Sequence, residues 1–358
     1  MMPPMLSRQN NFDAIRLLAA AAVIFGHAHP LTRSADVVLL GNSVQAVAVK
    51  IFFVVSGFLI AISWQLDPNP VRYMRKRALR IFPGLAWLLT LTVLILGPAL
   101  TTVPLSAYFT DGNTWHYFWS NLLLSPVYAL GGLFPSNPYP NAVNGSLWSL
   151  PVEFLMYLAM PAVLIFSRIG GNALLFVAFS VGLLTASLFS LRAGSLPPTQ
   201  VYYGTSLASV LDVAPYFFLG SIFAVTNIYK ILSVEFALFL VALFAIFQPS
   251  TEFGKEVALY VVLPVTVLSL GVANTPYFNR AGRFGDFSYG LYLYGFVVQQ
   301  VFLYFFPAQN PVQNTVCALV VSIVLAWISW HAIESPALRL KKARTTRPEI
   351  KVQERSQV

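Results

Sequence analysis

The 358-residue chain is 57% apolar and only 10% charged, with a mean hydropathy of +0.69. A soluble surface needs roughly a quarter of the chain charged, so the composition excludes a soluble protein and predicts a membrane protein. The net charge of +9 points in this setting to cytoplasmic loops rather than to nucleic acid. One cysteine, Cys317, excludes an intrachain disulfide and a cysteine-rich metal site, and the four histidines have no metal-ligand spacing.

Long stretches without Asp, Glu, Lys or Arg predict membrane-spanning helices along the whole chain. A span needs roughly 20 mostly apolar residues, so the last stretch holds two, and about ten spans are predicted. Continuous apolar runs rather than short alternating segments favour an all-α integral membrane protein over a closed barrel. The stretches are Leu17 to Thr32, Ile51 to Leu66, Ile81 to Thr110, Phe154 to Ser167, Ile169 to Leu191, Val213 to Tyr229, Phe236 to Thr251, Val257 to Asn279 and Phe287 to Ile333.

The basic residues predict the orientation, because loops rich in Lys and Arg stay in the cytoplasm. With ten spans and both termini cytoplasmic, 17 of the 22 basic residues lie inside and only three, Arg33, Arg192 and Lys255, lie outside. The first apolar segment is interpreted as a retained helix rather than a signal peptide, since Asp13 precedes it and no small-residue cleavage site follows. We expect a membrane domain over residues 1–338 and a basic cytoplasmic tail over 339–358.

The first predicted helix carries two ionisable residues on one face. Arg16 and His27 are eleven residues apart, which is three helical turns plus roughly 20°, and about 16 Å along the axis. His29 falls some 220° around from Arg16, so the two histidines are not equivalent. A histidine packed near the outer interface is one interpretation of His27. The intramembrane arginine in phase with it favours a functional one, because ionisable residues in spans are costly.

Glu153 is an acid early in a predicted span, with Pro151 suited to the first helical turn and Tyr157 one turn further on. One interpretation is a charge pair that fixes helix packing, for example with Lys50. The alternative is a carboxylate that orients a catalytic histidine and sets its tautomer.

A basic segment, Arg72 to Arg80, directly precedes the third predicted span. Cytoplasmic topology by itself explains this charge. Arg77 and Arg80 are nonetheless three residues apart and share a helical face, a geometry that can bind phosphates through bidentate contacts.

Two other features carry weaker signals. Ser56 and Gly57 in an apolar helix indicate close helix packing rather than a nucleophile, because no base neighbours Ser56 in the sequence. The aromatic loop over residues 101–144 is either an interfacial belt or a sugar-stacking surface.

Taken in order, six segments resemble the large bacterial family of multipass membrane acyltransferases that O-acetylate surface polysaccharides, often called acyltransferase family 3. The resemblance covers nearly the whole chain. It implies that Arg16 and His27 are required, that Arg77 and Arg80 handle the acyl-CoA, and that the helix with Glu153 supports the site. The matching segments are Phe12-Asp-Ala-Ile-Arg with His27, Phe52-Phe-Val-Val-Ser-Gly-Phe, Arg77-Ala-Leu-Arg, Ser146-Leu-Trp-Ser-Leu-Pro-Val-Glu-Phe, Phe287-Ser-Tyr-Gly-Leu-Tyr-Leu-Tyr and Glu334-Ser-Pro.

The chain departs from the family pattern at two positions. Many members have a histidine where Gly295 stands, which weakens the case for a catalytic role of that helix. An acidic or neutral residue often precedes the Phe-Phe pair where this chain has Lys50 and Ile51, and this difference points to a subgroup.

The sequence therefore predicts an O-acyltransferase of the bacterial inner membrane that moves an acyl group, with acetyl favoured, from cytoplasmic acyl-CoA to a sugar hydroxyl of a surface or exported polysaccharide. Acetyl-CoA is a donor substrate, and no permanently bound cofactor or metal is expected. His27 is assigned as general base or transient acyl carrier, Glu153 as the group that stabilises its cation, and Arg16, Arg77 and Arg80 as donor ligands. A cavity joining the arginines to His27 is predicted.

Two other functions are consistent with the same residues. A transporter or flippase of lipid-linked saccharide would use Arg16, Lys50 and Glu153 to line a path, but no internal repeat supports it. A structural subunit of polysaccharide assembly would tolerate loss of Arg77 and Arg80. Partners are expected to be acyl-CoA, a glycan or lipid-linked saccharide and membrane lipid, not nucleic acid, and the homo-oligomeric state is left open.

Overall fold

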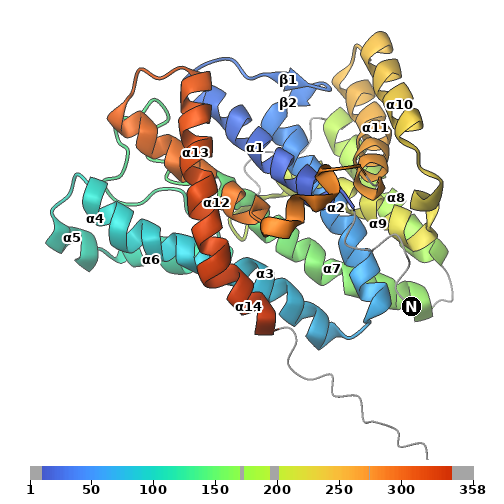
Figure 1. The fold of residues 1–358 in the computed structure, drawn as a ribbon, viewed down its shortest axis with the longest axis horizontal. Coiled ribbons are helices and arrows are strands. Elements are labelled where there is room, and N and C mark those ends of the chain that lie inside the picture. The colour runs from blue at the N-terminus through green and yellow to red at the C-terminus, as the bar shows by residue number, and fades with distance from the viewer. Residues whose placement is uncertain (1–9, 170–172, 194–200, 274, 341–358) are drawn as a thin grey trace, which may run out of the picture.

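The computed structural model describes residues 10–169, 173–193, 201–273 and 275–340, and these residues are almost entirely helical (Figure 1). The predicted all-α class is confirmed. In the described residues the strands form two short hairpins, β1 (Val38–Leu39) with β2 (Asn42–Ser43) and β3 (Val201–Tyr202) with β4 (Thr205–Ser206). The predicted cytoplasmic tail lies, from residue 341 onward, outside the described residues.

The helices follow one another with short connections. The first half contains α1 (Phe12–Leu31), α2 (Val44–Leu66), α3 (Pro70–Leu91), the π-helical η2 (Thr92–Leu96), α4 (Gly97–Leu100), α5 (Leu105–Thr110), α6 (Gly112–Leu122), the 3₁₀ helix η3 (Gly145–Trp148) and α7 (Ser149–Ile169). The second half contains α8 (Ala173–Ala193), α9 (Leu207–Thr226), η4 (Ile228–Ile231), α10 (Val234–Phe247), α11 (Glu252–Val272), η5 (Phe278–Phe284), α12 (Ser288–Phe305), α13 (Pro311–Ser329), the π-helical η6 (Trp330–Glu334) and α14 (Ser335–Arg339).

Seven of the described helical segments are long and apolar enough to cross a membrane, and α8 and α10 contain shorter apolar stretches. The long stretch from residue 287 to 333 contains two helices, α12 and α13, separated around Pro307 and Pro311. Helix α13 belongs to one of the seven segments and α12 does not, so two spans in this stretch stay a prediction. The total of ten spans and the cytoplasmic termini stay predictions.

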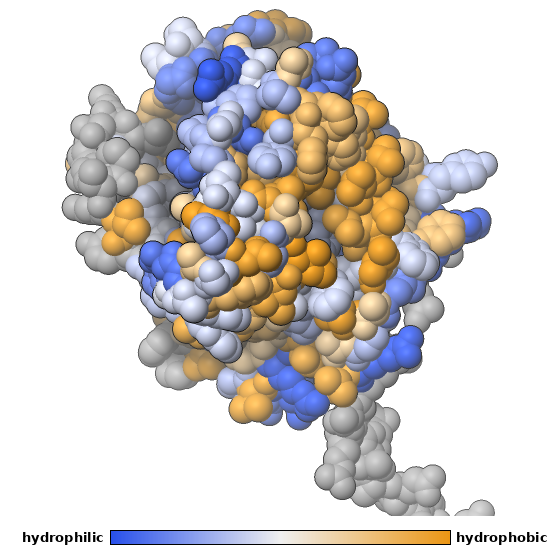
Figure 2. All heavy atoms as spheres, turned by 90° about the vertical axis from the view of Figure 1, so that its left-hand side faces the viewer, coloured by the Kyte–Doolittle hydropathy of each residue, from blue (hydrophilic) through white to orange (hydrophobic). Residues whose placement is uncertain are grey.

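The exterior of the bundle matches a lipid environment. Figure 2 shows an apolar area on one face, with more hydrophilic surfaces above and below it. The exposed side chains of α13 are largely apolar, among them Val316, Val320, Val324 and Trp327. Such a surface would aggregate in water but is the ordinary lipid-facing surface of a spanning helix. The chain is therefore a membrane protein.

Several helices begin before the predicted charge-free stretches. Helix α2 begins at Val44 and includes Lys50, and α1 includes both Asp13 and Arg16. The charges at Lys50 and Arg16 are accommodated inside the bundle because each has an acidic partner: Lys50 pairs with acids on α9 and α11, and Arg16 pairs with Asp286 just before α12. Stretches without charged residues therefore underestimate the lengths of these helices.

Helices α2 and α9 pack closely against each other, and small residues make this contact possible. A Cβ added to Gly57 would lie 1.9 Å from the Phe217 carbonyl oxygen, and one added to Gly220 would lie 2.2 Å from the Val54 carbonyl oxygen. The Ser221 hydroxyl also donates a hydrogen bond to the Gly57 carbonyl, at 3.0 Å. The interpretation of the Ser56-Gly57 segment as a packing element is thus correct for Gly57.

Replacing Gly57 with alanine is expected to lower the thermal stability of the detergent-solubilised protein, because α2 and α9 must separate. Overpacking of this kind costs about 1–3 kcal/mol. Gly182→Ala on α8 is the control, since a Cβ there meets nothing within 4 Å and alanine is the better helix former. Fluorescence-detected size-exclusion melting curves measure both. Equal midpoints for the two variants would show that the α2–α9 contact is not limiting.

Gly295 brings α12 against α1. A Cβ at Gly295 would lie 2.5 Å from Ile24 Cγ1, so a histidine there would collide with α1. A histidine at position 295 would therefore require a different packing of α1 on α12.

Candidate active site

Two cavities lie along α1, one toward each end. The Arg cavity has a volume of about 50 Å³ and is lined by Arg16, Val49, Phe52, Phe53, Arg80, Ile81, Ser149, Leu150, Glu153, Tyr157, Tyr289 and Tyr292. The His cavity has a volume of about 490 Å³ and is lined by His27, Pro30, Leu31, Tyr128, Ala129, Tyr139, Pro140, Asn141, Ala142, Gly145 and Phe296. Arg16 and His27 thus serve different cavities.

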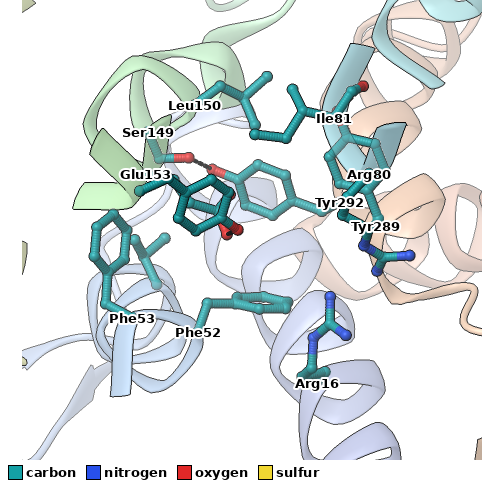
Figure 3. A pocket seen from close by; sticks show the side chains of 12 residues that line it. Arg16, Phe52, Phe53, Arg80, Ile81, Ser149, Leu150, Glu153, Tyr289 and Tyr292 are labelled. Carbon is teal, nitrogen blue, oxygen red and sulfur yellow. Dashed lines mark hydrogen bonds between the residues drawn. The ribbon is translucent and has the colours of Figure 1, made fainter. Parts of the chain in front are cut away.

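The two arginines of the Arg cavity are joined by one carboxylate. Arg16 Nη1 from α1 and Arg80 Nη2 from α3 each lie 2.6 Å from the same oxygen, Oδ2 of Asp286. Figure 3 shows both guanidinium groups on one side of the cavity. The other oxygen of Asp286 accepts hydrogen bonds from the hydroxyl and backbone N–H of Ser288, at 2.5 and 3.3 Å. Two distant segments, α1 and α3, therefore converge on Asp286.

The charge state of Asp286 follows from its neighbours. Burial favours the neutral acid, but the positive charges of Arg16 and Arg80 and the hydrogen bonds from Ser288 outweigh it, so the pKa of Asp286 lies well below its usual range. Asp286 is therefore an anion throughout the physiological pH range. Sequence reasoning missed this residue.

Glu153 lines the Arg cavity from α7, where it is bonded to neutral groups. Its Oε1 accepts a hydrogen bond from the Ser56 hydroxyl at 3.2 Å and a short one from the Tyr157 hydroxyl. The predicted pairing of Glu153 with His27 is not formed, because His27 lines the other cavity. The carboxylate therefore faces the Arg cavity and not His27.

Lys50 does not pair with Glu153 either. Its fully buried ammonium lies 2.9 Å from Asp212 Oδ1 and 3.1 Å from Glu256 Oε1, on α9 and α11. The Tyr216 hydroxyl donates to the same oxygen of Glu256 at 2.7 Å. The expected charge pair for Lys50 exists with other acids, and it joins α2, α9 and α11 away from both cavities.

Of the two predicted phosphate-binding arginines, Arg80 lines the Arg cavity and Arg77 does not. The Arg77 guanidinium lies 5.7 Å from the Tyr157 ring centre and 5.9 Å from that of Tyr73. It thus packs beside the tyrosine that binds Glu153. The spacing of three residues placed both arginines on α3 correctly, but Arg16 rather than Arg77 is the partner of Arg80.

His27 and His29 have different environments, as their helical phase predicts. The His27 ring packs edge-on against Phe296, with ring centres 5.3 Å apart, and its Nδ1 is buried without a hydrogen-bond partner. His29 is buried, and its Nδ1 hydrogen-bonds the Phe25 carbonyl at 3.0 Å. Of the two, His27 is the one that faces a cavity.

One wall of the His cavity is formed by the loop between α6 and η3, which is hydrogen-bonded to α12. Gln300 Nε2 donates to the carbonyl oxygens of Tyr139 and Ala142 at 2.8 and 2.6 Å, and Asn137 Nδ2 donates to Gln300 Oε1 at 2.8 Å. These bonds fix Tyr139 beside the cavity. The aromatic loop therefore divides into cavity-lining residues, Tyr128 and Tyr139, and residues elsewhere, such as the exposed Trp115 and Trp119.

The predicted single cavity is wrong, because a thin partition separates the two. Tyr292 of α12 lines the Arg cavity and Phe296, one helical turn later, lines the His cavity. One turn corresponds to a separation of about 6 Å along the helix. The Tyr292 hydroxyl shares a hydrogen bond of 2.6 Å with Ser149, and the Tyr292 ring packs edge-on against Phe52 (Figure 3). These aromatic side chains close the Arg cavity.

The fold is thus that of a membrane protein in which apolar helices enclose a guanidinium pair at one cavity and a histidine at the next. The model of the acyltransferase 3 family, described as an acyltransferase domain, matches residues 9–331. The chain belongs to this family of membrane acyltransferases and is therefore an enzyme.

Curated relatives agree with this assignment. A protein named O-acetyl transferase from Shigella phage Sf6 is 28% identical, over 92% of this chain and 96% of its own length. Nodulation protein 10 of Rhizobium leguminosarum bv. viciae is also 28% identical, over 95% and 96%. Acyltransferase MdmB of Streptomyces mycarofaciens is 29% identical over 45% of this chain and 40% of its length. No solved structure matches the chain.

Proposed function

We propose that the protein transfers an acetyl group from cytoplasmic acetyl-CoA to a sugar hydroxyl of a surface or exported polysaccharide, as an O-acetyltransferase of the bacterial inner membrane. Membership of the acyltransferase family and similarity to a protein named O-acetyl transferase support this chemistry. The observation that carries it is the placement of a cationic cavity and a histidine cavity about one helical turn apart on α12.

The Arg cavity is the donor side. Arg16 and Arg80 offer guanidinium N–H groups suited to phosphate oxygens. Many basic residues of α3 lie toward the same end, including Arg72, Arg75 and Lys76, which by the positive-inside rule faces the cytoplasm. A volume of about 50 Å³ is far below an ordinary ligand site. The nucleotide therefore stays at the mouth, and only the narrow acyl end of the donor enters.

The His cavity is the acceptor side. With about 490 Å³ it has the size of an ordinary ligand site. Tyr128 and Tyr139 provide ring faces of the kind on which sugars stack. His27 lies where a hydroxyl group entering this cavity would need a base.

His27 removes the proton of the acceptor hydroxyl as that oxygen attacks the thioester carbonyl. The carbon–sulfur bond then breaks and coenzyme A leaves as its thiol after taking up the proton. The alternative is that His27 itself takes the acyl group and passes it to the sugar. Both routes require the acyl group to pass the partition, so Tyr292 and Phe52 must move while the donor is bound.

Glu153 acts within the Arg cavity rather than on His27. Its carboxylate opposes the charges of Arg16 and Arg80 across a small space and holds the hydroxyl of Tyr157. This arrangement keeps the cavity close to neutral before the donor binds and orders the wall that the acyl end passes.

A gene deletion with complementation tests the function. Proton NMR of the purified surface glycan should show loss of O-acetyl signals in the deletion strain, recovery with the wild-type gene and no recovery with His27→Ala. Unchanged O-acetyl content together with lost glycan export would instead favour the transporter. Full acetylation by a variant lacking both Arg77 and Arg80 would favour the structural subunit.

A further inference from the structure

We propose that Asp286 is a positioning residue for the donor, because its carboxylate holds the guanidinium groups of Arg16 and Arg80 as a pair at the edge of the Arg cavity. This inference rests on the proposed function, since it takes the Arg cavity as the donor site. Asp286 does not itself line the cavity. It therefore acts through the two arginines rather than by touching the acyl donor.

The positions of three side chains show how Asp286 holds the two guanidinium groups together. Arg16 and Arg80 come from α1 and α3, and both terminal nitrogens lie 2.6 Å from the same Asp286 oxygen. The second oxygen is bound by Ser288 at the start of α12, so the carboxylate cannot turn freely. The direction of both guanidinium groups is fixed by one side chain whose own orientation is fixed.

The charge balance requires such a partner. The three side chains are only 13–19% exposed, so two neighbouring guanidinium charges would repel strongly without an anion between them. One carboxylate leaves the group of three with a net charge of +1. Each guanidinium has five N–H donors, and one nitrogen of each is bound to Asp286. Donors remain for the phosphate oxygens of an incoming ligand.

Two other roles make different predictions. A carboxylate that merely ties α1 and α3 to α12 would affect folding but not donor affinity. A carboxylate that occupies the place of the donor phosphate would compete with it, so its removal would tighten donor binding. A positioning role predicts weaker donor binding after removal, with the chemical step much less affected.

The test is acetyl-transfer kinetics of the detergent-purified full chain, with acetyl-CoA varied and unacetylated glycan from the deletion strain as acceptor. Asp286→Asn keeps the shape and removes the charge, and it is expected to raise the KM for acetyl-CoA about tenfold while kcat changes less than about threefold. Asp286→Glu restores the charge and should give a smaller rise. In a variant that already carries both Arg16→Ala and Arg80→Ala, the Asp286→Asn change should have little further effect on KM, because both arginines through which Asp286 acts are gone.

Asp67→Asn is the matched control. Asp67 pairs with Arg72 and Lys76 of α3, the helix that carries Arg80, at 2.6 and 2.9 Å. It does not line the Arg cavity, so the KM of the Asp67→Asn variant for acetyl-CoA should equal that of the wild type. An unchanged or lowered KM for Asp286→Asn overturns the proposal. So does the absence of both Asp286 variants from the membrane when Asp67→Asn accumulates, because Asp286 is then structural. A wild-type protein that uses no acetyl-CoA refutes the proposed function and this inference together.

Discussion

Replacing His27 with alanine is expected to reduce acetyl transfer by about 10²- to 10⁴-fold, the usual contribution of a positioned general base. The substitution removes the basic side chain that lines the acceptor cavity. The His27 ring packs against Phe296 at the cavity wall, so the fold should tolerate its loss and the variant should reach the membrane in normal amounts. O-acetyl content of the glycan by NMR and initial rates with purified protein measure the effect.

His29→Ala is the control for this prediction. His29 lies two residues away on the same helix, but it is hydrogen-bonded to the Phe25 carbonyl and does not line the cavity. We expect it to change stability more than activity per folded molecule. Near-normal acetylation by His27→Ala with loss in His29→Ala would show that the assignment of the base is wrong.

Removal of either cavity arginine is expected to weaken donor binding. A hydrogen bond to a charged group contributes about 1.5–3 kcal/mol, which corresponds to a rise of about tenfold to a hundredfold in the KM for acetyl-CoA after Arg16→Ala or Arg80→Ala. Arg80→Lys should recover only part of this, because an ammonium group cannot make the paired contacts of a guanidinium. Arg77→Ala should have a smaller effect, since Arg77 packs on Tyr157 and Tyr73 outside the cavity.

Arg75→Ala provides the comparison for the arginine series. Arg75 is an exposed residue of the same helix, and it donates to the Leu340 carbonyl at 2.9 Å. Its loss removes one positive charge from this end of the protein without touching the cavity, so the KM should change little. If Arg75→Ala raised the KM as much as Arg80→Ala, general surface charge rather than a built site would attract the donor.

The helices and part of the site could be predicted from the sequence because both depend on local spacing. Apolar runs located most of the long helices, and the eleven-residue separation placed Arg16 and His27 on one face of α1. The pairing of Glu153 with Tyr157 follows from their four-residue spacing. Each of these inferences needs only the geometry of a single helix.

Contacts between helices could not be predicted in this way. Lys50 was expected near an acid, but the acids it binds, Asp212 and Glu256, come from α9 and α11. Asp286 was missed because it lies in the turn before α12, far in sequence from Arg16 and Arg80, although two partly buried arginines favour an acidic partner. A search for an acidic partner among the few Asp and Glu residues next to the spans could have found Asp286.

The division into two cavities also depends on tertiary structure. Helical phase placed Arg16 and His27 on one side of α1, but it cannot show which side chains of α12 and η3 lie between them. Tyr292 and its hydrogen bond to Ser149 form that partition. We propose from this division that donor and acceptor enter from opposite sides of the membrane.

Transfer in sided proteoliposomes tests this claim most directly. Vesicles with the protein in one orientation, verified by protease access to a C-terminal tag, would receive radiolabelled acetyl-CoA on one side and unacetylated glycan on the other. We expect O-acetylated glycan only when acetyl-CoA is on the side of Arg16 and Arg80 and glycan is on the side of His27. Product formed only when both substrates are on the same side would contradict it.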